Sequence, residues 1–170
     1  HIYESKLGKV RIEYESMFAL GSLCGIENAD DIAELVGLCD EFGLDTISTG
    51  GTIAFAMECV EKGMLAEPWL QFGSMAAAKK AIGLIANREG LGKILSLGSR
   101  QAAHLIGQGS IAYAPQVKGL EIPGYEPRGL QTMALGLAVA SRGADHNRSG
   151  AYEADFSPPT GEVLDNSAIA

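Results

Sequence analysis

The amino-acid sequence predicts a mainly α-helical fold with few short strands. Within residues 29–42, apolar side chains recur at helical spacing, namely at Ile32, Leu35, Val36, Cys39 and Phe42. Residues 130–140 are small and apolar nearly all round, which is typical of a buried helix. Strand-like alternation of polar and apolar residues appears in the short segment 9–14. These three observations favour helices as the main element of the fold.

The first half of the chain divides into helices separated by glycine-rich breaks. We expect a short apolar helix over residues 16–23, then a break at residues 25–28. Asn28 or Asp30 can cap the helix over residues 29–42. A further helix, apolar on one stripe, is predicted over residues 53–62 and ends at Gly63.

The second half continues this pattern and ends in a polar stretch. Ser74 can cap a helix over residues 75–87, and Gly98 separates two short helices over residues 91–97 and 99–106. Residues 111–117 look extended, with Pro115 limiting them to an edge or a loop. We expect residues 1–148 to form the helical domain or domains and residues 149–170 a turn-rich tail.

The composition and net charge of the chain limit the kinds of partner that it is expected to bind. The chain has 170 residues, of which 46% are hydrophobic, so one domain with a core is possible. A net charge of −8 argues against binding to nucleic acid or to an anionic membrane. No apolar run is long enough to span a bilayer and no basic-then-apolar leader is present, so we expect a cytoplasmic protein. The first residue is His1 rather than methionine, which suggests a piece of a longer chain.

The three cysteines do not form a metal-binding or cluster-binding unit. Cys24, Cys39 and Cys59 are far apart in the sequence and make no C-x-x-C pair. Cys39 and Cys59 lie beside apolar residues on predicted helix faces, so we expect buried free thiols. This usage agrees weakly with a reducing compartment.

Polar groups concentrate at the corner between the second and third predicted helices, in residues 40–52. Gly43 follows the last periodic residue, where a helix favours a left-handed cap, and Thr49 to Gly51 precede the next predicted helix. Asp40 and Asp45 place two carboxylates across this corner. Carboxylates accept paired N–H bonds from a planar, guanidine-like edge such as that of a pterin ring. An ordinary helix-loop-helix corner with its usual caps uses the same residue types.

Several blocks in this chain resemble the tungsten-containing aldehyde ferredoxin oxidoreductase family. Asp40-x-x-Gly43-Leu44-Asp45-Thr46 is similar to the pterin-binding motif of that family, and the likeness continues through residues 47–51. It returns in residues 117–121, 127–129 and 141–146. The blocks follow in the right order over almost the whole chain. The resemblance implies an irregular helical fold like domains 2 and 3 of the family.

The resemblance also implies roles for particular residues. Asp40 and Asp45 would hold one pterin by its amino edge, with Gly43, Leu44 and Thr46 shaping the turn. Glu34 and His146 would flank the metal, and Glu15, in a matching Glu13-Tyr14-Glu15 block, is a weaker candidate by position only. No residue of this segment is expected to ligate the metal itself.

The residues alone support less specific interpretations of the same positions. Glu34 lies about 200° around a helical wheel from Ile32, on a face that would be solvated. Acids such as Glu15, placed ahead of a helix, commonly form a solvated rim. His146 is flanked by Asp145 and follows an apolar helix, where an imidazole can move protons near neutral pH, although most histidines in such places are structural.

The activity implied by the resemblance is oxidation of a small aldehyde to a carboxylic acid. The implied cofactors are a tungsten or molybdenum bis-pterin and a [4Fe–4S] cluster whose cysteine ligands lie outside this segment. Implied partners are ferredoxin, the remaining domains of a parent chain and a second copy in a homodimer. Two alternatives stay open: reduction of carboxylic acids or aromatic acyl-CoA thioesters, and a helical interaction domain without catalysis. The isolated segment is expected to be inactive.

Overall fold

The computed structural model describes residues 2–5 and 8–156, and within them helices predominate, as the sequence predicts. Two antiparallel hairpins are formed by β1 (Ile2–Ser5) with β2 (Gly8–Arg11), and by β3 (Gln116–Val117) with β4 (Leu120–Glu121). The α-helices are α1 (Tyr14–Leu20), α2 (Ala29–Phe42), α3 (Thr46–Glu61), α4 (Met75–Asn87), α5 (Gly92–Leu95), α6 (Ser99–Ile106), α7 (Gln131–Val139), α8 (His146–Ser149) and α9 (Tyr152–Phe156). Short 3₁₀ turns cover Ser22–Cys24 and Ser110–Tyr113.

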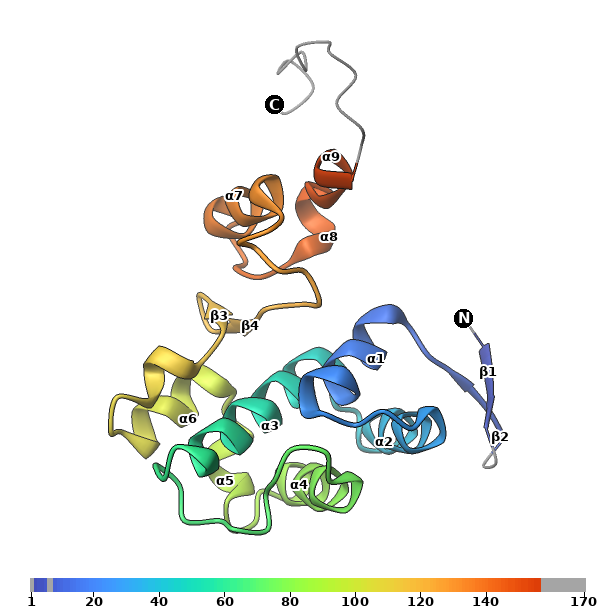
Figure 1. Cartoon of the computed structure of the whole chain (residues 1–170), viewed down its shortest axis with the longest axis vertical. Coiled ribbons are helices and arrows are strands. Elements are labelled where there is room, and N and C mark those ends of the chain that lie inside the picture. Colours follow the sequence, from blue (N-terminus) through green and yellow to red (C-terminus); the bar gives the residue numbers. More distant parts are fainter. Residues whose placement is uncertain (1, 6–7, 157–170) are drawn as a thin grey trace.

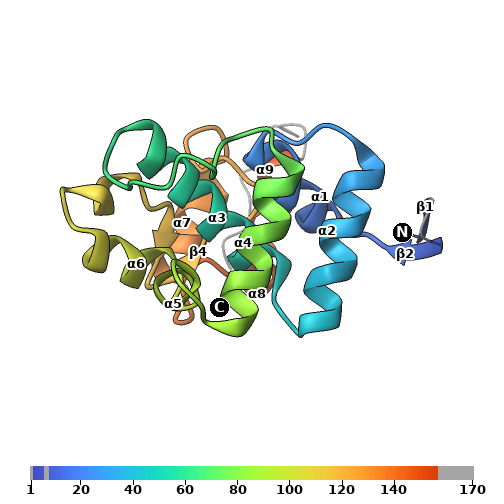
Figure 2. The same cartoon turned by 90° about the horizontal axis from the view of Figure 1, so that it is seen from below.

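The described chain has two parts of unequal size (Figure 1). We call residues 14–114, which hold α1 to α6, the core lobe, and residues 122–156, which hold α7 to α9, the C-terminal lobe. The β3–β4 hairpin lies between them. In the core lobe, α3 contacts α1, α4, α5 and α6, and α2 packs beside α4 (Figure 2). The central position of α3 explains why nearly all of its side chains from Thr49 to Cys59 are buried.

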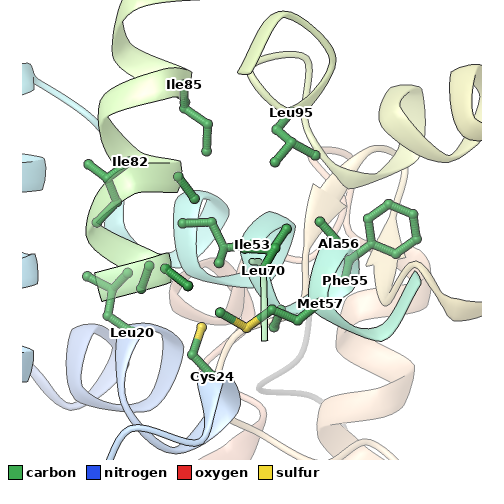
Figure 3. Packing of buried hydrophobic residues seen from close by; sticks show 14 of the residues in the cluster. Leu20, Cys24, Ile53, Phe55, Ala56, Met57, Leu70, Ile82, Ile85 and Leu95 are labelled. Atoms are coloured by element: carbon green, nitrogen blue, oxygen red, sulfur yellow. The ribbon is translucent and has the colours of Figure 1, made fainter. Parts of the chain in front are cut away.

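The core lobe is built on one large hydrophobic cluster (Figure 3). Its fully buried side chains come from elements that include α1 to α4 and the connection before α4, among them Leu20, Leu35, Ile53, Met57, Leu70 and Ile82. Cys24, Cys39 and Cys59 belong to the same cluster and are free thiols, which confirms the predicted burial of Cys39 and Cys59. Burial raises the pKa of the Cys24 thiol to about 12, so it stays protonated and unreactive near neutral pH.

The third helix begins earlier than predicted. We expected residues 49–51 to precede the helix, but α3 starts at Thr46 and includes them. The glycines that suggest a break instead allow a close helix crossing, because a Cβ on Gly50 would lie 2.4 Å from the carbonyl oxygen of Ala19 in α1. The low-propensity residues are therefore required by packing and do not end the helix.

Other boundaries agree with prediction to different degrees. Helices α2, α4 and α6 have the predicted bounds, and Asn28 and Ser74 cap α2 and α4 by accepting backbone N–H bonds. The strand expected within residues 9–14 is β2, which pairs Val10 with Tyr3. The segment predicted to be extended from residue 111 instead starts as a 3₁₀ turn and becomes strand only at Gln116.

The C-terminal lobe has a small core of its own. Met133, Leu137 and Ala144 form its buried cluster. The prediction that residues 130–140 form a wholly buried helix is wrong in part, since Leu135 and Val139 on α7 are 64% and 69% exposed. Within the described residues, nothing packs on that side of the helix.

Two further observations concern the end of the C-terminal lobe and the length and apolar character of the helices. The tail predicted from residue 149 contains α9, and its remainder from residue 157 lies outside the described residues. Among the described residues, none of the helices combines the length and the apolar character needed to cross a membrane.

Candidate functional site

The corner between α2 and α3 has the glycine cap that the sequence predicts at the end of α2, whereas α3 begins earlier than predicted. Gly43 ends α2 with φ of 67°, and its N–H bonds to the carbonyl of Asp40 at 3.2 Å. Leu44 N–H bonds to the carbonyl of Cys39 at 2.8 Å and its side chain packs against the main core. Asp45 begins α3, where its Oδ2 accepts the N–H of Ser48 at 2.7 Å. The corner is therefore rigid, and it fixes Asp45 at the amino end of a buried helix.

A polar cavity of about 350 Å³ opens beside this corner. It is bounded by the first turn of α3, by β4 and by the segment that leads into α8. Its polar lining residues include Asp45, Ser48, Glu121, Arg142, Asp145 and His146. The cavity joins groups from both lobes, because Asp45 belongs to the core lobe and His146 to the C-terminal lobe.

Glu15 of α1 meets His146 of α8. Their atoms Oε1 and Nε2 are 3.5 Å apart, and the two side chains are only 12% and 11% exposed. The other oxygen, Glu15 Oε2, accepts the N–H of Gly124 at 2.7 Å. Glu15 Oε1 is the one buried side-chain nitrogen or oxygen atom in the described part of the chain that has no hydrogen-bond partner. A buried carboxylate oxygen left without a donor is costly, so each such exception needs a specific explanation.

Aromatic rings hold the imidazole in place. The ring of Tyr125 lies 5.3 Å from that of His146 and is stacked on Tyr152 at 5.1 Å, while Tyr14 donates from its hydroxyl to the carbonyl of Gly124 at 2.8 Å. Burial, and next the charge of Glu15, raises the pKa of the Tyr125 phenol. The acid and the imidazole are thus enclosed by rings that restrict their movement.

Asp145, which precedes His146, organises the start of α8. Its Oδ1 accepts the N–H of Asn147 at 3.1 Å, and its Oδ2 lies 2.9 Å from Arg142 Nη1. Arg148 Nε is a second basic neighbour at 3.6 Å. The arginines that flank His146 in the sequence are therefore paired with Asp145, leaving Glu15 as the acid beside the imidazole.

The structure brings some predicted site residues together and separates others. Asp45 and His146 line one cavity, and Glu15 is in contact with His146. Thr46 shares a hydrogen bond of 2.9 Å with Ser16 of α1, so it ties the corner to the helix that carries Glu15. Asp40 is exposed at the end of α2 and is not among the residues that line the cavity.

Glu34 lies apart from His146 in this chain. It pairs with Lys79 across the contact between α2 and α4, and it does not line the cavity of His146. The reason is its position on α2: the opposite side of this helix, which carries Leu35 and Cys39, is buried in the core. Within this chain the acid next to His146 is Glu15, and the role of Glu34 beside the metal stays a prediction.

Glu121 and Tyr125 were not predicted as site residues. Glu121 stands in the family-like block 117–121, and Tyr125 follows a Pro-Gly turn. The likeness of residues 117–121 to the family was the sequence feature that pointed to Glu121. Only the folded structure shows that the two residues border the cavity and the acid–imidazole pair.

The fold and the site define a helical domain with a polar cavity next to a buried acid–imidazole pair. Comparison with known proteins identifies the domain. The family described as aldehyde ferredoxin oxidoreductase, domains 2 & 3, matches residues 1–168, and the chain belongs to this family.

Individual relatives agree with that assignment. The chain is 43% identical to the tungsten-containing aldehyde ferredoxin oxidoreductase of Pyrococcus furiosus and 44% identical to that of Thermococcus kodakarensis, in each case over 140 residues and 79% of this chain. It is 34% identical over 163 residues to an aliphatic sulfonate oxidoreductase, WOR-like subunit, of Pyrococcus furiosus. The chain covers 23% of the first two relatives and 26% of the third, about a quarter of their length.

Proposed function

We propose that this segment forms one wall of a tungsten-pterin site in an oxidoreductase that converts aldehydes to carboxylic acids. The observation that carries the proposal is the Glu15–His146 pair, buried beside a cavity that Asp45 also lines. The family to which the chain belongs and the names of its relatives at 43–44% identity support the same function.

The residues of the cavity fit a pterin. A pterin edge presents planar N–H donors, and the cavity offers carboxylate acceptors from Asp45, Glu121 and Asp145. Asp45 would hold the ring from inside the cavity, and Asp40 from the exposed rim of the same corner. Gly43, Leu44 and Thr46 would keep the corner in shape. Within the described residues no group of three or more His, Cys, Asp or Glu side chains could hold a metal, so the metal would be held by the pterins.

The reaction requires proton transfer that this chain can provide. Oxidation of an aldehyde with water yields a carboxylate, three protons and two electrons. When bound, the tungsten-pterin supplies the two-electron acceptor and the oxygen-transfer chemistry. The imidazole of His146 accepts a proton, and the Oε1 atom of Glu15, 3.5 Å from Nε2, stabilises the resulting imidazolium. The enclosing rings of Tyr125 and Tyr152 keep this pair oriented and limit the access of bulk water.

Electron transfer belongs to the rest of the parent enzyme. We propose that the electrons leave through a [4Fe–4S] cluster to ferredoxin, with the cluster bound by cysteines outside this segment. Cys24, Cys39 and Cys59 are unsuited to that role because each is buried in the helical core and burial raises the pKa of each thiol. We further propose that the parent enzyme is a homodimer located in the cytoplasm.

Variants of the full-length parent enzyme test the assignment. We expect His146→Ala and Glu15→Gln to lower aldehyde-dependent dye reduction by ~10²-fold or more, the usual contribution of a general acid or base. Tungsten content should be retained in both, because neither side chain ligates the metal. Asp45→Ala should instead lower tungsten and pterin content.

Glu34→Gln is the matched comparison for Glu15→Gln. The two changes have the same chemistry, but Glu34 is paired with Lys79 away from the cavity. Loss of turnover in Glu34→Gln with full turnover in Glu15→Gln would reject the acid assigned here. A parent enzyme that contains tungsten but reduces carboxylic acids or thioesters without oxidising aldehydes would reject the reaction.

A further inference from the structure

Glu121 is a buried carboxylate that the proposed reaction does not use. It lies on β4, is 3% exposed, and lines the polar cavity. Its backbone position is fixed by a tight turn, since Lys118 and Gly119 both have positive φ, 55° and 90°, between β3 and β4. The turn and the hairpin set Glu121 between the two lobes.

One oxygen of Glu121 is fully engaged. Oε1 accepts both the N–H and the hydroxyl of Ser99, each at 2.7 Å, and the hydroxyl of Thr52 at 3.3 Å. Two glycines leave space for the side chain: a Cβ on Gly51 would lie 3.0 Å from the Glu121 side chain, and one on Gly98 would lie 3.2 Å from Oε1. Three donors on one oxygen hold a buried charge in a single orientation.

The other carboxylate oxygen of Glu121, Oε2, is not engaged in this way. No described residue donates a hydrogen bond to Oε2, yet Oε2 is not among the fully buried unpaired atoms, as Glu15 Oε1 is. Because Glu121 lines the cavity, Oε2 is the part of the carboxylate that has access to it. It is therefore a fixed acceptor presented to whatever occupies the cavity.

The arrangement of the acceptors indicates the chemistry of that occupant. The carboxylates of Asp45, Glu121 and Asp145 border the cavity, but they do not converge into a metal-binding group within the described part of the chain. Separated acceptors suit a planar molecule with several N–H donors better than a single cation. Asp145 is already paired with Arg142. Asp45 and Glu121 each have one oxygen bonded to a protein donor, and the second oxygen of each is left for a ligand.

We propose that Glu121 is a further cofactor-binding residue, whose Oε2 accepts an N–H bond from the pterin that Asp45 also contacts. The inference rests on the proposed function, since it takes the cavity to be the pterin site. Glu121 binds from the hairpin while Asp45 binds from α3, so the pterin is held between two elements that are far apart in the sequence.

Glu121→Gln in the full-length holoenzyme tests this inference. The glutamine can keep an oxygen at the Oε1 position for Ser99, but it presents an amide N–H in place of Oε2 and so meets the ligand with a donor. We expect pterin to be released from the purified enzyme ~10-fold faster or more, the equivalent of losing one hydrogen bond to a charged group. Thr52→Val, which removes only the longest bond to Oε1, should change the release rate less than twofold. Release is measured as free pterin after gel filtration, with melting temperature recorded for each variant.

A lower melting temperature for Glu121→Gln with unchanged pterin release would show that Glu121 is only a structural link, and would overturn the inference. If the variant does not accumulate, carbodiimide labelling of the wild-type enzyme decides. Glu121 should be protected in the holoenzyme and labelled after pterin release, while the more exposed Glu58 is labelled equally in both states. Equal labelling of Glu121 in both states would overturn the inference. A parent enzyme that never contains pterin would refute the proposed function itself.

Discussion

The core lobe and the C-terminal lobe each contribute residues to the candidate site, but the hydrophobic clusters that support these residues differ greatly in size. Asp45 caps α3 and Glu15 lies on α1, and both helices pack into a continuous hydrophobic cluster. His146 lies on a four-residue helix, and among the described residues the cluster of its lobe has Met133, Leu137 and Ala144 as its buried members. A lobe that buries so little apolar surface depends on its contacts with its neighbours.

Among the described residues, polar contacts join the C-terminal lobe to α1. Gly124 N–H donates to Glu15, the Tyr14 hydroxyl donates to Gly124, and His146 meets Glu15 across the same junction. The catalytic pair proposed here is thus also part of the junction. It follows that disturbing the smaller lobe should affect the pair without unfolding the larger lobe.

The largest effect is expected at the helix crossing in the core lobe. Gly50→Ala places a Cβ 2.4 Å from the backbone oxygen of Ala19, and neither backbone can move without separating α1 from α3. We expect a loss of about 3 kcal/mol or more in the free energy of unfolding, the size typical of overpacking in a core. Urea unfolding of the 170-residue chain, followed by far-ultraviolet circular dichroism, measures this change.

Gly37→Ala is the control for that substitution. Gly37 lies inside α2, and a Cβ there would meet nothing within 4 Å. The same change should therefore stabilise the chain by ~0.5–1 kcal/mol through helix propensity. Equal effects of the two substitutions would contradict the close packing of α1 on α3.

Removing a core side chain from each lobe separates their stabilities. Met133→Ala should cost ~2–3 kcal/mol but only locally, because Met133 is fully buried in the small cluster. In hydrogen exchange, amides of α7 to α9 should lose protection while those of α2 to α4 keep theirs. Met57→Ala, in the large cluster, should lower protection throughout the core lobe. Uniform loss of protection in Met133→Ala would mean that the two lobes unfold as one unit.

The difference between the lobes also explains what the sequence could predict. Helices α2, α4 and α6 have local signals, periodicity and caps, and their bounds were predicted correctly. The start of α3 was missed because Gly50 and Gly51 satisfy long-range packing against Ala19 and Glu121, which no local pattern contains. Local rules therefore describe the core lobe well, except where another segment approaches closely.

The site was predictable only in part for the same physical reason. Its corner, from Gly43 to Asp45, is defined by neighbours in the sequence. The pairing of Glu15 with His146 depends on how the hairpin and α8 fold back over α1. Helical periodicity does not show which glutamate, Glu15 or Glu34, meets the imidazole. A single sequence shows which acids lie near helix ends, but it does not show which of them meets the imidazole.

The smallest effect we predict concerns the pH dependence of the C-terminal lobe. Asp155 of α9 accepts the N–H groups of Thr132 and Met133 at the start of α7, at 3.0 and 2.8 Å. Desolvation of the Asp155 carboxyl opposes a shift, but these hydrogen bonds outweigh it and lower its pKa. Because the pKa is lower in the folded state, the stabilisation is fully present above the usual carboxyl pKa and is lost as the pH falls through the folded value. The near-ultraviolet signal of the Tyr125–Tyr152 stack should therefore weaken with acidification. Asp155→Asn should weaken that signal at neutral pH and make it less sensitive to acid, whereas an unchanged acid titration in Asp155→Asn would assign the transition to another carboxyl group.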